Sequence, residues 1–130
     1  MVDFFREATL QTPLISFKTN GEMEIKGRAI PDNPEPFWSD ALVWFDKYSE
    51  NPCPHTIFRI DLEYFNISSS KRILFLLYKL NEIVEQGLEA KVEWYYRKAD
   101  EEMYEVGQDY AFMVKVPFDF KEYDHDIAVA

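Results

Sequence analysis

Three consecutive serines, Ser68, Ser69 and Ser70, are the residues of this chain whose position favours chemistry. They follow Asn66 and precede a long apolar segment, where the pattern predicts that a strand gives way to a helix. The N-terminus of a helix has unpaired backbone N–H groups and a partial positive charge, so it favours negative charge. A hydroxyl there can cap the helix, accept a phosphate or, beside a positioned base, act as a nucleophile. We expect the hydroxyls of Ser68 and Ser69 to be open to a partner.

The segments on either side of the serines predict a strand followed by an amphipathic helix. Residues 57–65 alternate between polar and apolar side chains and are rich in β-branched and aromatic types, which is typical of a strand. Apolar residues then recur at intervals of three and four, as on one face of a helix: Ile73, Leu76, Leu77, Leu80, Ile83 and Val84. Asn66 or Ser68 is the predicted N-cap, and Gly87 the residue after the last turn.

The other patterns predict a small α/β fold. Residues 1–13 carry few periodic signals, and we assign them no element. Two alternating runs, 14–19 and 22–29, flank Asn20-Gly21, a pair typical of a type I′ hairpin turn. The later elements are a helix with an aromatic face from about Pro36 to Asn51, a strand at 90–97 parallel to 57–65, a helix at 101–114 and a strand at 116–123, whose Pro117 favours an edge. We expect a single domain over 1–130, with a small mixed sheet opened by the hairpin, about three helices packed on it and a loose tail at 124–130.

Composition and charge disfavour some classes of binding partner and indicate where the protein is located. The formal net charge is −10, which disfavours nucleic acid and anionic membrane surfaces. Cys53 is the single cysteine, so no internal disulfide framework is expected. The N-terminus lacks a signal-peptide pattern, and no window approaches the about 18 apolar residues that cross a bilayer. We therefore expect a cytoplasmic protein.

Metal and cofactor sites have little support in the sequence. Cys53 and His55 are two positions apart, and the other histidine, His125, is near the C-terminus. No CxxC, HxxxH or HExxH pattern is present, and the glycines do not cluster as in a phosphate-binding loop. We expect neither a metal nor a cofactor.

Three functions remain open on the residues alone. The first is a surface at the serine turn whose charge is altered by phosphorylation; its structural alternative is that the serines only cap the helix. A small serine-dependent hydrolase is a second alternative, although no Gly-x-Ser-x-Gly elbow surrounds Ser68 to Ser70 and no histidine is assigned to them. A self-associating module, with Tyr95 or Tyr96 exposed on a homodimer face, is the third.

Several short motifs follow one another along nearly the whole chain. They are Ala8-Thr9-x-x-Thr12-Pro13, Ile30-Pro31-Asp32-Asn33, Asp61-Leu62-x-Tyr64-Phe65-Asn66-x-Ser68-Ser69-x-Lys71, Val92-Glu93-Trp94-Tyr95-Tyr96 and Asp100-x-x-Met103-x-Glu105-x-Gly107-x-Asp109. In this order they resemble the SiaC family of bacterial regulatory phosphoproteins. The resemblance implies a variant of the anti-sigma-factor-antagonist (STAS) fold, which agrees with the predicted order of elements.

The resemblance also implies a function without catalysis. Members of the family are phosphorylated by a SiaB-like kinase and dephosphorylated by a SiaA-like phosphatase. In the unphosphorylated form they bind and activate a diguanylate cyclase, and so act on cyclic-di-GMP signalling and biofilm formation. By this resemblance, the partner-binding residues here are Asn66, Ile67, Ser70 and Lys71.

One position departs from the family pattern. The acceptor hydroxyl of the family comes directly after the asparagine, and here that residue is Ile67. Isoleucine cannot carry a phosphate. Either Ser68 or Ser69 is then the acceptor, or this chain is not switched in that way.

Overall fold

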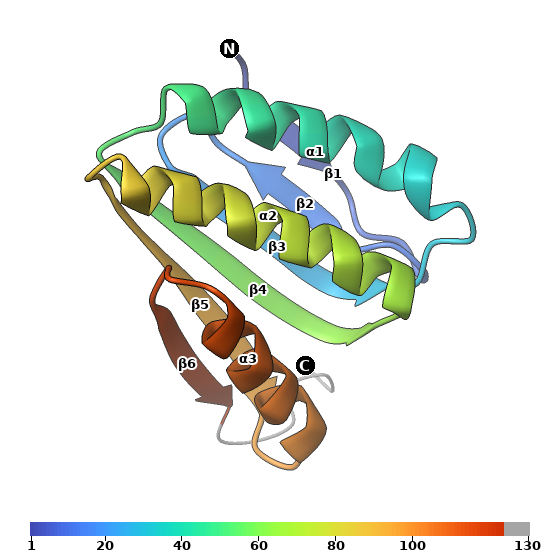
Figure 1. Cartoon of the computed structure of the whole chain (residues 1–130). Coiled ribbons are helices and arrows are strands. Elements are labelled where there is room, and N and C mark those ends of the chain that lie inside the picture. The colour runs from blue at the N-terminus through green and yellow to red at the C-terminus, as the bar shows by residue number, and fades with distance from the viewer. Residues whose placement is uncertain (124–130) are drawn as a thin grey trace.

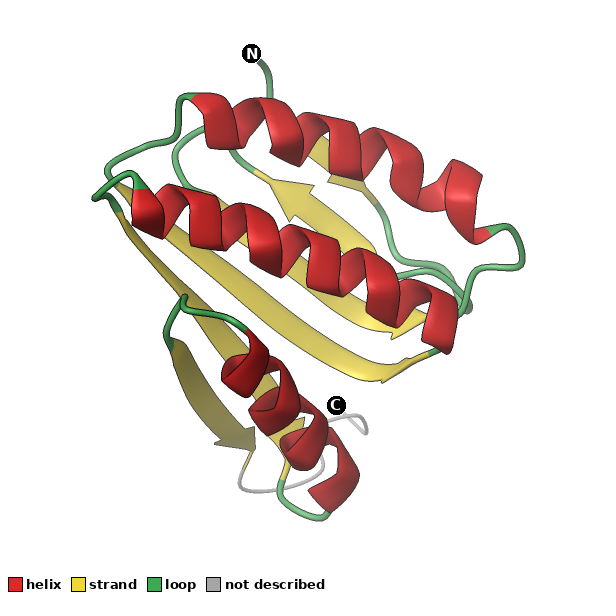
Figure 2. Cartoon of the chain, viewed as in Figure 1, coloured by secondary structure: helices red, strands yellow, loops and turns green. Residues whose placement is uncertain are grey.

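The computed structural model describes residues 1–123, so the predicted loose tail at 124–130 lies outside the described residues. Its elements, in chain order, are β1 (Phe4–Arg6), β2 (Leu14–Phe17), β3 (Glu22–Ala29), α1 (Pro34–Glu50), β4 (His55–Phe65), α2 (Ile67–Glu85), β5 (Glu89–Arg97), α3 (Glu101–Met113) and β6 (Phe118–Tyr123) (Figure 1 and Figure 2). The predicted α/β class, with a mixed sheet and three helices, is confirmed.

The six strands form one sheet in the order β1-β2-β3-β4-β5-β6. The first three strands are antiparallel, whereas β3, β4, β5 and β6 are parallel. Each parallel pair is joined through one helix, because a crossover is needed to return the chain to the same end of the sheet. The predicted parallel pairing of β4 with β5 is confirmed, with Ile60 opposite Trp94. Strand β6 takes the edge position that Pro117 favours.

Two details at the N-terminus correct the sequence analysis. Strand β1 was not predicted, because three residues are too few for a periodic signal; it exists through pairing with β2, where Phe4 lies opposite Phe17. The hairpin is present, but its turn is not type I′. Among residues 1–123 only glycines have positive φ, so Asn20 does not, and Gly21 has φ of 99°. The loop is a three-residue turn whose last residue is left-handed.

The helices lie on one face of the sheet (Figure 1), and buried apolar side chains of helices and strands form the hydrophobic core there. The aromatic face of α1 packs there, as the sequence predicts. Phe45 of α1 and Phe17 of β2 each lie with ring centroids 5.5 Å from that of Phe58, at the centre of β4. All three side chains are fully buried. Apolar burial on this scale is the main source of stability for such a two-layer fold.

The opposite face of the sheet is polar and laced with ion pairs. Arg59 of β4 donates from Nε to Oε1 of Glu93 on β5 at 2.9 Å. Lys91 and Lys121 extend this network toward Asp119. Within residues 1–123, no helix is both long and apolar enough to span a bilayer.

Candidate partner-binding site at the start of α2

Asn66 forms the junction between β4 and α2. Its backbone is extended, and its N–H donates to the carbonyl of Ala29 at 3.1 Å. The side-chain Oδ1 accepts from the N–H of Ser69 at 2.9 Å and from the hydroxyl of Ser68 at 3.1 Å. Asn66, rather than Ser68, is therefore the N-cap, which settles the alternative left open by the sequence. Its side chain is committed to the local structure.

Ser69 points into the protein and not toward solvent. Its side chain is fully buried, and its Oγ accepts a hydrogen bond from Nε1 of Trp38 at 3.2 Å. The expectation that both Ser68 and Ser69 are open to a partner is thus wrong for Ser69. The reason is tertiary: α1 packs beside the first turn of α2, and the indole N–H needs an acceptor when it is buried.

Four residues form the outer surface of this turn: Ile67, Ser68, Ser70 and Lys71, which we call the turn surface. Ile67 is 78% exposed. Lys71 is exposed, while Ser68 and Ser70 are half-buried. The hydroxyl of Ser70 donates to the carbonyl of Ile67 at 2.6 Å. Ile67 and Lys71 are therefore the exposed members of the turn surface.

Two further residues hold the turn and were not foreseen. Arg72 donates from Nη1 to the carbonyl of Ser68 at 3.1 Å, which keeps its guanidinium within one helical turn of the Ser68 hydroxyl. Tyr110 of α3 donates from its hydroxyl to the carbonyl of Ser70 at 3.0 Å. Burial raises the pKa of Tyr110 to about 12, so this donor stays protonated at neutral pH. Arg72 was recognisable as an i, i+4 neighbour of Ser68, whereas nothing local indicates Tyr110.

The apolar surface continues from Ile67 along α2. Phe75 is 38% exposed and Tyr78 is 47% exposed, and both fall outside the buried three-and-four pattern of the helix. Large exposed apolar side chains gathered on one helix face are typical of a protein-binding surface. In the sequence, this surface could have been recognised from Phe75 and Tyr78, because they are large apolar residues outside the buried pattern.

Among the described residues 1–123, no histidine lies beside the turn to act as the base that a serine nucleophile requires. The side-chain partner of Ser68 is Asn66. His55 lies at the opposite end of β4, where its Nδ1 is 2.5 Å from Oε2 of Glu89. His125 lies outside the described residues. Among residues 1–123, no cluster of His, Cys, Asp and Glu side chains could hold a metal ion.

The two tyrosines considered for a homodimer face are not freely exposed. Tyr95 is half-buried and donates from its hydroxyl to Oε1 of Glu93 at 3.2 Å. Tyr96 is also half-buried, and its ring centroid lies 4.8 Å from that of Tyr104. Their expected exposure is therefore wrong, because both rings pack against neighbouring strands or helices.

Comparison with known proteins agrees with this geometry. The model for the SiaC family regulatory phosphoproteins matches residues 6–123. An uncharacterised protein of Pseudomonas aeruginosa (strain UCBPP-PA14) is 22% identical over 125 residues, covering 95% of this chain and 99% of that protein.

Solved structures of SiaC from Pseudomonas aeruginosa share the fold. Apo-SiaC has a TM-score of 0.86 at 21% identity, over 93% of this chain and 99% of that chain. The crystal structure of the diguanylate cyclase SiaD in complex with its activator SiaC contains a match with a TM-score of 0.85 at 21% identity, over 93% of this chain and 100% of that chain. With the family model matched along nearly its whole length, the chain belongs to the SiaC family of regulatory phosphoproteins.

Proposed function

We propose that this protein is a non-enzymatic, cytoplasmic partner switch that binds and activates a diguanylate cyclase through the turn surface. The observation that carries the proposal is the exposure of Ile67 at the start of α2, beside half-buried Ser68 and exposed Lys71. The fold match to a complex in which SiaC is the activator of the cyclase SiaD supports the same role. An exposed apolar residue such as Ile67 is typical of the core of a docking surface, and a charged residue such as Lys71 is typical of its rim.

Ser68 is the proposed phosphate acceptor, in preference to Ser69. Kinases need an accessible hydroxyl, and the Ser69 hydroxyl is sealed beneath Trp38. A phosphate on Ser68 would lie in the first turn of α2, where the helix dipole favours negative charge. Arg72, already bonded to the Ser68 carbonyl, is close enough to pair with it. Phosphorylation at Ser68 would therefore leave the helix intact and change only the charge of the surface.

The added charge supplies the switch. A phosphoserine carries about −1.5 to −2 charges at neutral pH. Beside Ile67, this charge would oppose docking in either of two ways. An apolar partner face would have to desolvate it, and an acidic partner face would repel it. A SiaB-like kinase would release the cyclase in this way, and a SiaA-like phosphatase would restore binding.

Intact-mass measurement tests the switch directly. The full chain is incubated with a SiaB-like kinase and ATP, together with the variants Ser68→Ala and Ser69→Ala. We expect one added phosphate on the native chain and on Ser69→Ala, and none on Ser68→Ala. No phosphate on the native chain would remove the regulatory half of the proposal. Loss of phosphate from Ser69→Ala alone would reassign the acceptor.

A pull-down with the diguanylate cyclase tests the binding half. We expect the unphosphorylated chain to retain the cyclase and raise its output of cyclic-di-GMP, and the variant Ser68→Asp to retain less. Gln108→Glu is the matched control, because it adds the same charge at an exposed position on α3, outside the turn surface. Equal cyclase binding by Ser68→Asp and the native chain would contradict the charge mechanism.

A further inference from the structure

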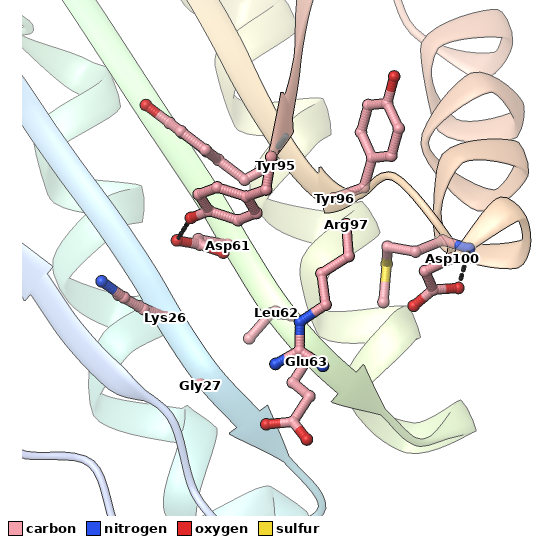
Figure 3. A pocket seen from close by; sticks show the side chains of 11 residues that line it. Lys26, Gly27, Asp61, Leu62, Glu63, Tyr95, Tyr96, Arg97 and Asp100 are labelled. Atoms are coloured by element: carbon pink, nitrogen blue, oxygen red, sulfur yellow. Dashed lines mark hydrogen bonds between the residues drawn. The ribbon is translucent and has the colours of Figure 1, made fainter. Parts of the chain in front are cut away.

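Strand β6 forms one edge of the sheet (Figure 1). In the described part of the chain it pairs on one side, with β5, and the register is continuous over its six residues. Tyr123 fixes its end, because the tyrosine hydroxyl donates to the carboxylate of Asp61 on β4 (dashed line at Asp61 in Figure 3). The edge is therefore a regular strand held in place by its own sheet, which is the kind of surface that another strand can extend.

Alternate residues of β6 turn their backbone groups to this edge. The N–H of Val92 on β5 donates to the carbonyl of Pro117 at 2.9 Å, and Val92 lies opposite Phe118. In a parallel ladder a residue bonds the two neighbours of the residue opposite it, so the odd-numbered residues of β6 face β5. The N–H and C=O groups that point outward are those of Phe118, Phe120 and Glu122.

The side chains of β6 alternate between charged groups and aromatic rings. Asp119 and Lys121 lie on the polar face of the sheet, with side chains 47% and 42% exposed and the charged groups 3.2 Å apart. Phe120 lies on the face that the helices cover. It is half-buried, and its ring centroid is 5.3 Å from that of Tyr104 on α3. A strand paired at this edge would therefore meet charges on one face and an aromatic ring on the other.

We propose that β6 pairs antiparallel with β6 of a second copy of this chain, about a two-fold axis through Phe120. In this register Phe120 lies opposite its own counterpart, and their outward N–H and C=O groups bond each other. Phe118 lies opposite Glu122 of the second copy, which continues the ladder on both sides of the axis. Asp119 lies opposite Lys121 of the second copy. Every contact is made twice, as a closed two-fold interface requires.

The charges favour this register over its neighbours. Moving the axis by one residue toward the N-terminus would place Asp119 opposite Asp119 of the second copy. Moving it by one residue the other way would place Lys121 opposite Lys121. Like charges directly opposite each other destabilise a strand pair. In the proposed register opposite charges meet, and the ion pair already present within each chain is kept.

Strand β1, at the other edge of the sheet, lacks this self-complementarity. Its outward backbone groups are those of Phe5, because the alternation along β2 turns the groups of Phe17 to β1 and those of Lys18 to β3. A two-fold pairing about Phe5 would place Asp3 opposite Glu7 of the second copy, and β1 has three residues. A second copy therefore fits β6 and not β1. The β6 edge is also independent of the turn surface, which lies at the start of α2.

Sedimentation velocity of the full chain tests the proposal. The native chain is measured from about 10 µM to about 1 mM, where weak interfaces associate, and the dimer fraction should rise with concentration. Asp119→Lys and Lys121→Asp each place like charges across the axis, so each should weaken self-association about tenfold. Mixed in equal amounts, the two variants should form a heterodimer, because opposite charges then meet again.

Two control variants make the same changes of net charge elsewhere. Glu105→Lys on α3 matches Asp119→Lys, and Lys18→Asp matches Lys121→Asp. Both positions are exposed and lie outside β6, so these variants should self-associate like the native chain.

Amide hydrogen exchange distinguishes a second copy from the chain's own segment 124–130 as the occupant of the edge. The amides of Phe118, Phe120 and Glu122 should exchange fast in dilute protein and become protected as the concentration rises. Protection of these amides at every concentration would mean that the chain itself covers the edge. That result, a monomer at all concentrations, or failure of the two mixed variants to associate would overturn the proposal.

Discussion

Trp38 and Ser69 join the first turn of α2 to α1: the indole Nε1 donates to the serine Oγ at 3.2 Å, and both side chains are fully buried. The pair also explains why neighbouring serines have different roles. Ser69 holds the helix in place, and Ser68 is left beside Ile67 on the surface.

Removing either member of this pair should destabilise the protein, and the effects of removing both should not add up. Ser69→Ala leaves the Trp38 N–H buried without an acceptor, so the free energy of unfolding should fall by about 1–3 kcal/mol. Trp38→Phe should cost a similar amount or more, because it also leaves a cavity. The double variant should cost less than the sum, as urea denaturation can show. Trp44→Phe is the control, since Trp44 bonds the carbonyl of Val2 near the surface. Strict additivity would contradict the coupling.

Removing the N-cap of α2 should weaken the helix without changing its position. Asn66→Ala loses the acceptor for the Ser69 N–H and should lower the free energy of unfolding by about 1 kcal/mol. Asn66→Asp keeps an acceptor and adds charge that the helix dipole favours, so it should unfold at or above the native temperature. Thermal unfolding followed by circular dichroism measures both. A drop in stability for Asn66→Asp as large as for Asn66→Ala would argue against the cap.

Gly107 is needed because Trp94 lies against it. A Cβ at this position would be 2.6 Å from Nε1 of Trp94 and 2.7 Å from its Cδ1. The indole is fully buried and bonded to the carbonyl of Met103, so it has little room to move. Gly107→Ala should lower the free energy of unfolding by about 1–3 kcal/mol through overpacking, although alanine is the better helix former by about 1 kcal/mol. Thermal unfolding measures this loss. The control is Gln108→Ala at the next position, which is exposed, and this variant should be neutral or slightly stabilising.

The ionised carboxylate of Glu93 should stabilise the fold, so the protein should be more stable at pH values above the pKa of this group than at pH values below it. Desolvation acts to raise the pKa of this carboxyl, but the charge and hydrogen bond of Arg59 outweigh it, so the pKa is lowered in the folded protein. Its contribution is therefore complete above the unfolded value, about pH 4.3, and is lost as the pH falls further through the folded value. Urea midpoints between neutral and acidic pH should change less in Glu93→Gln than in the native chain.

Glu22→Gln is the matched control for that titration. Glu22 also faces Arg59, at 3.9 Å, but its side chain is 51% exposed. Water screens such a pair, so this variant should keep the native pH dependence. Equal effects of the two variants would mean that burial of Glu93 is unimportant.

Ile67 should contribute to cyclase binding and not to folding. Because its side chain is 78% exposed, Ile67→Ala should leave the free energy of unfolding within about 0.5 kcal/mol of the native value. If the turn surface docks on the cyclase, the same change should lower affinity by about 1–2 kcal/mol in a titration calorimetry experiment. Val43→Ala, 57% exposed on α1, is the control and should bind normally. Unchanged affinity for Ile67→Ala would place the docking surface elsewhere.

Local patterns determined the helices, most strands and the cap of α2. Asn66 caps, Gly87 follows the last turn with positive φ, and the buried positions of α2 recur every three and four residues, because these features depend on neighbours in the chain. The exposure of Ile67 after the cap follows from the same periodicity.

The periodicity of α2 also puts Ser69 on the buried face, four residues before Ile73. Tertiary structure decided what covers that hydroxyl and where the sheet opens. Ser69 is sealed because Trp38, 31 residues earlier, needs an acceptor. Strand β1 exists only as a partner of β2, and the pairing of β4 with β5 stops after Ile60 and Trp94. The sequence determines which segments can form helices and strands, since those preferences are local; it does not show which groups become neighbours across the fold, since that depends on how the layers pack.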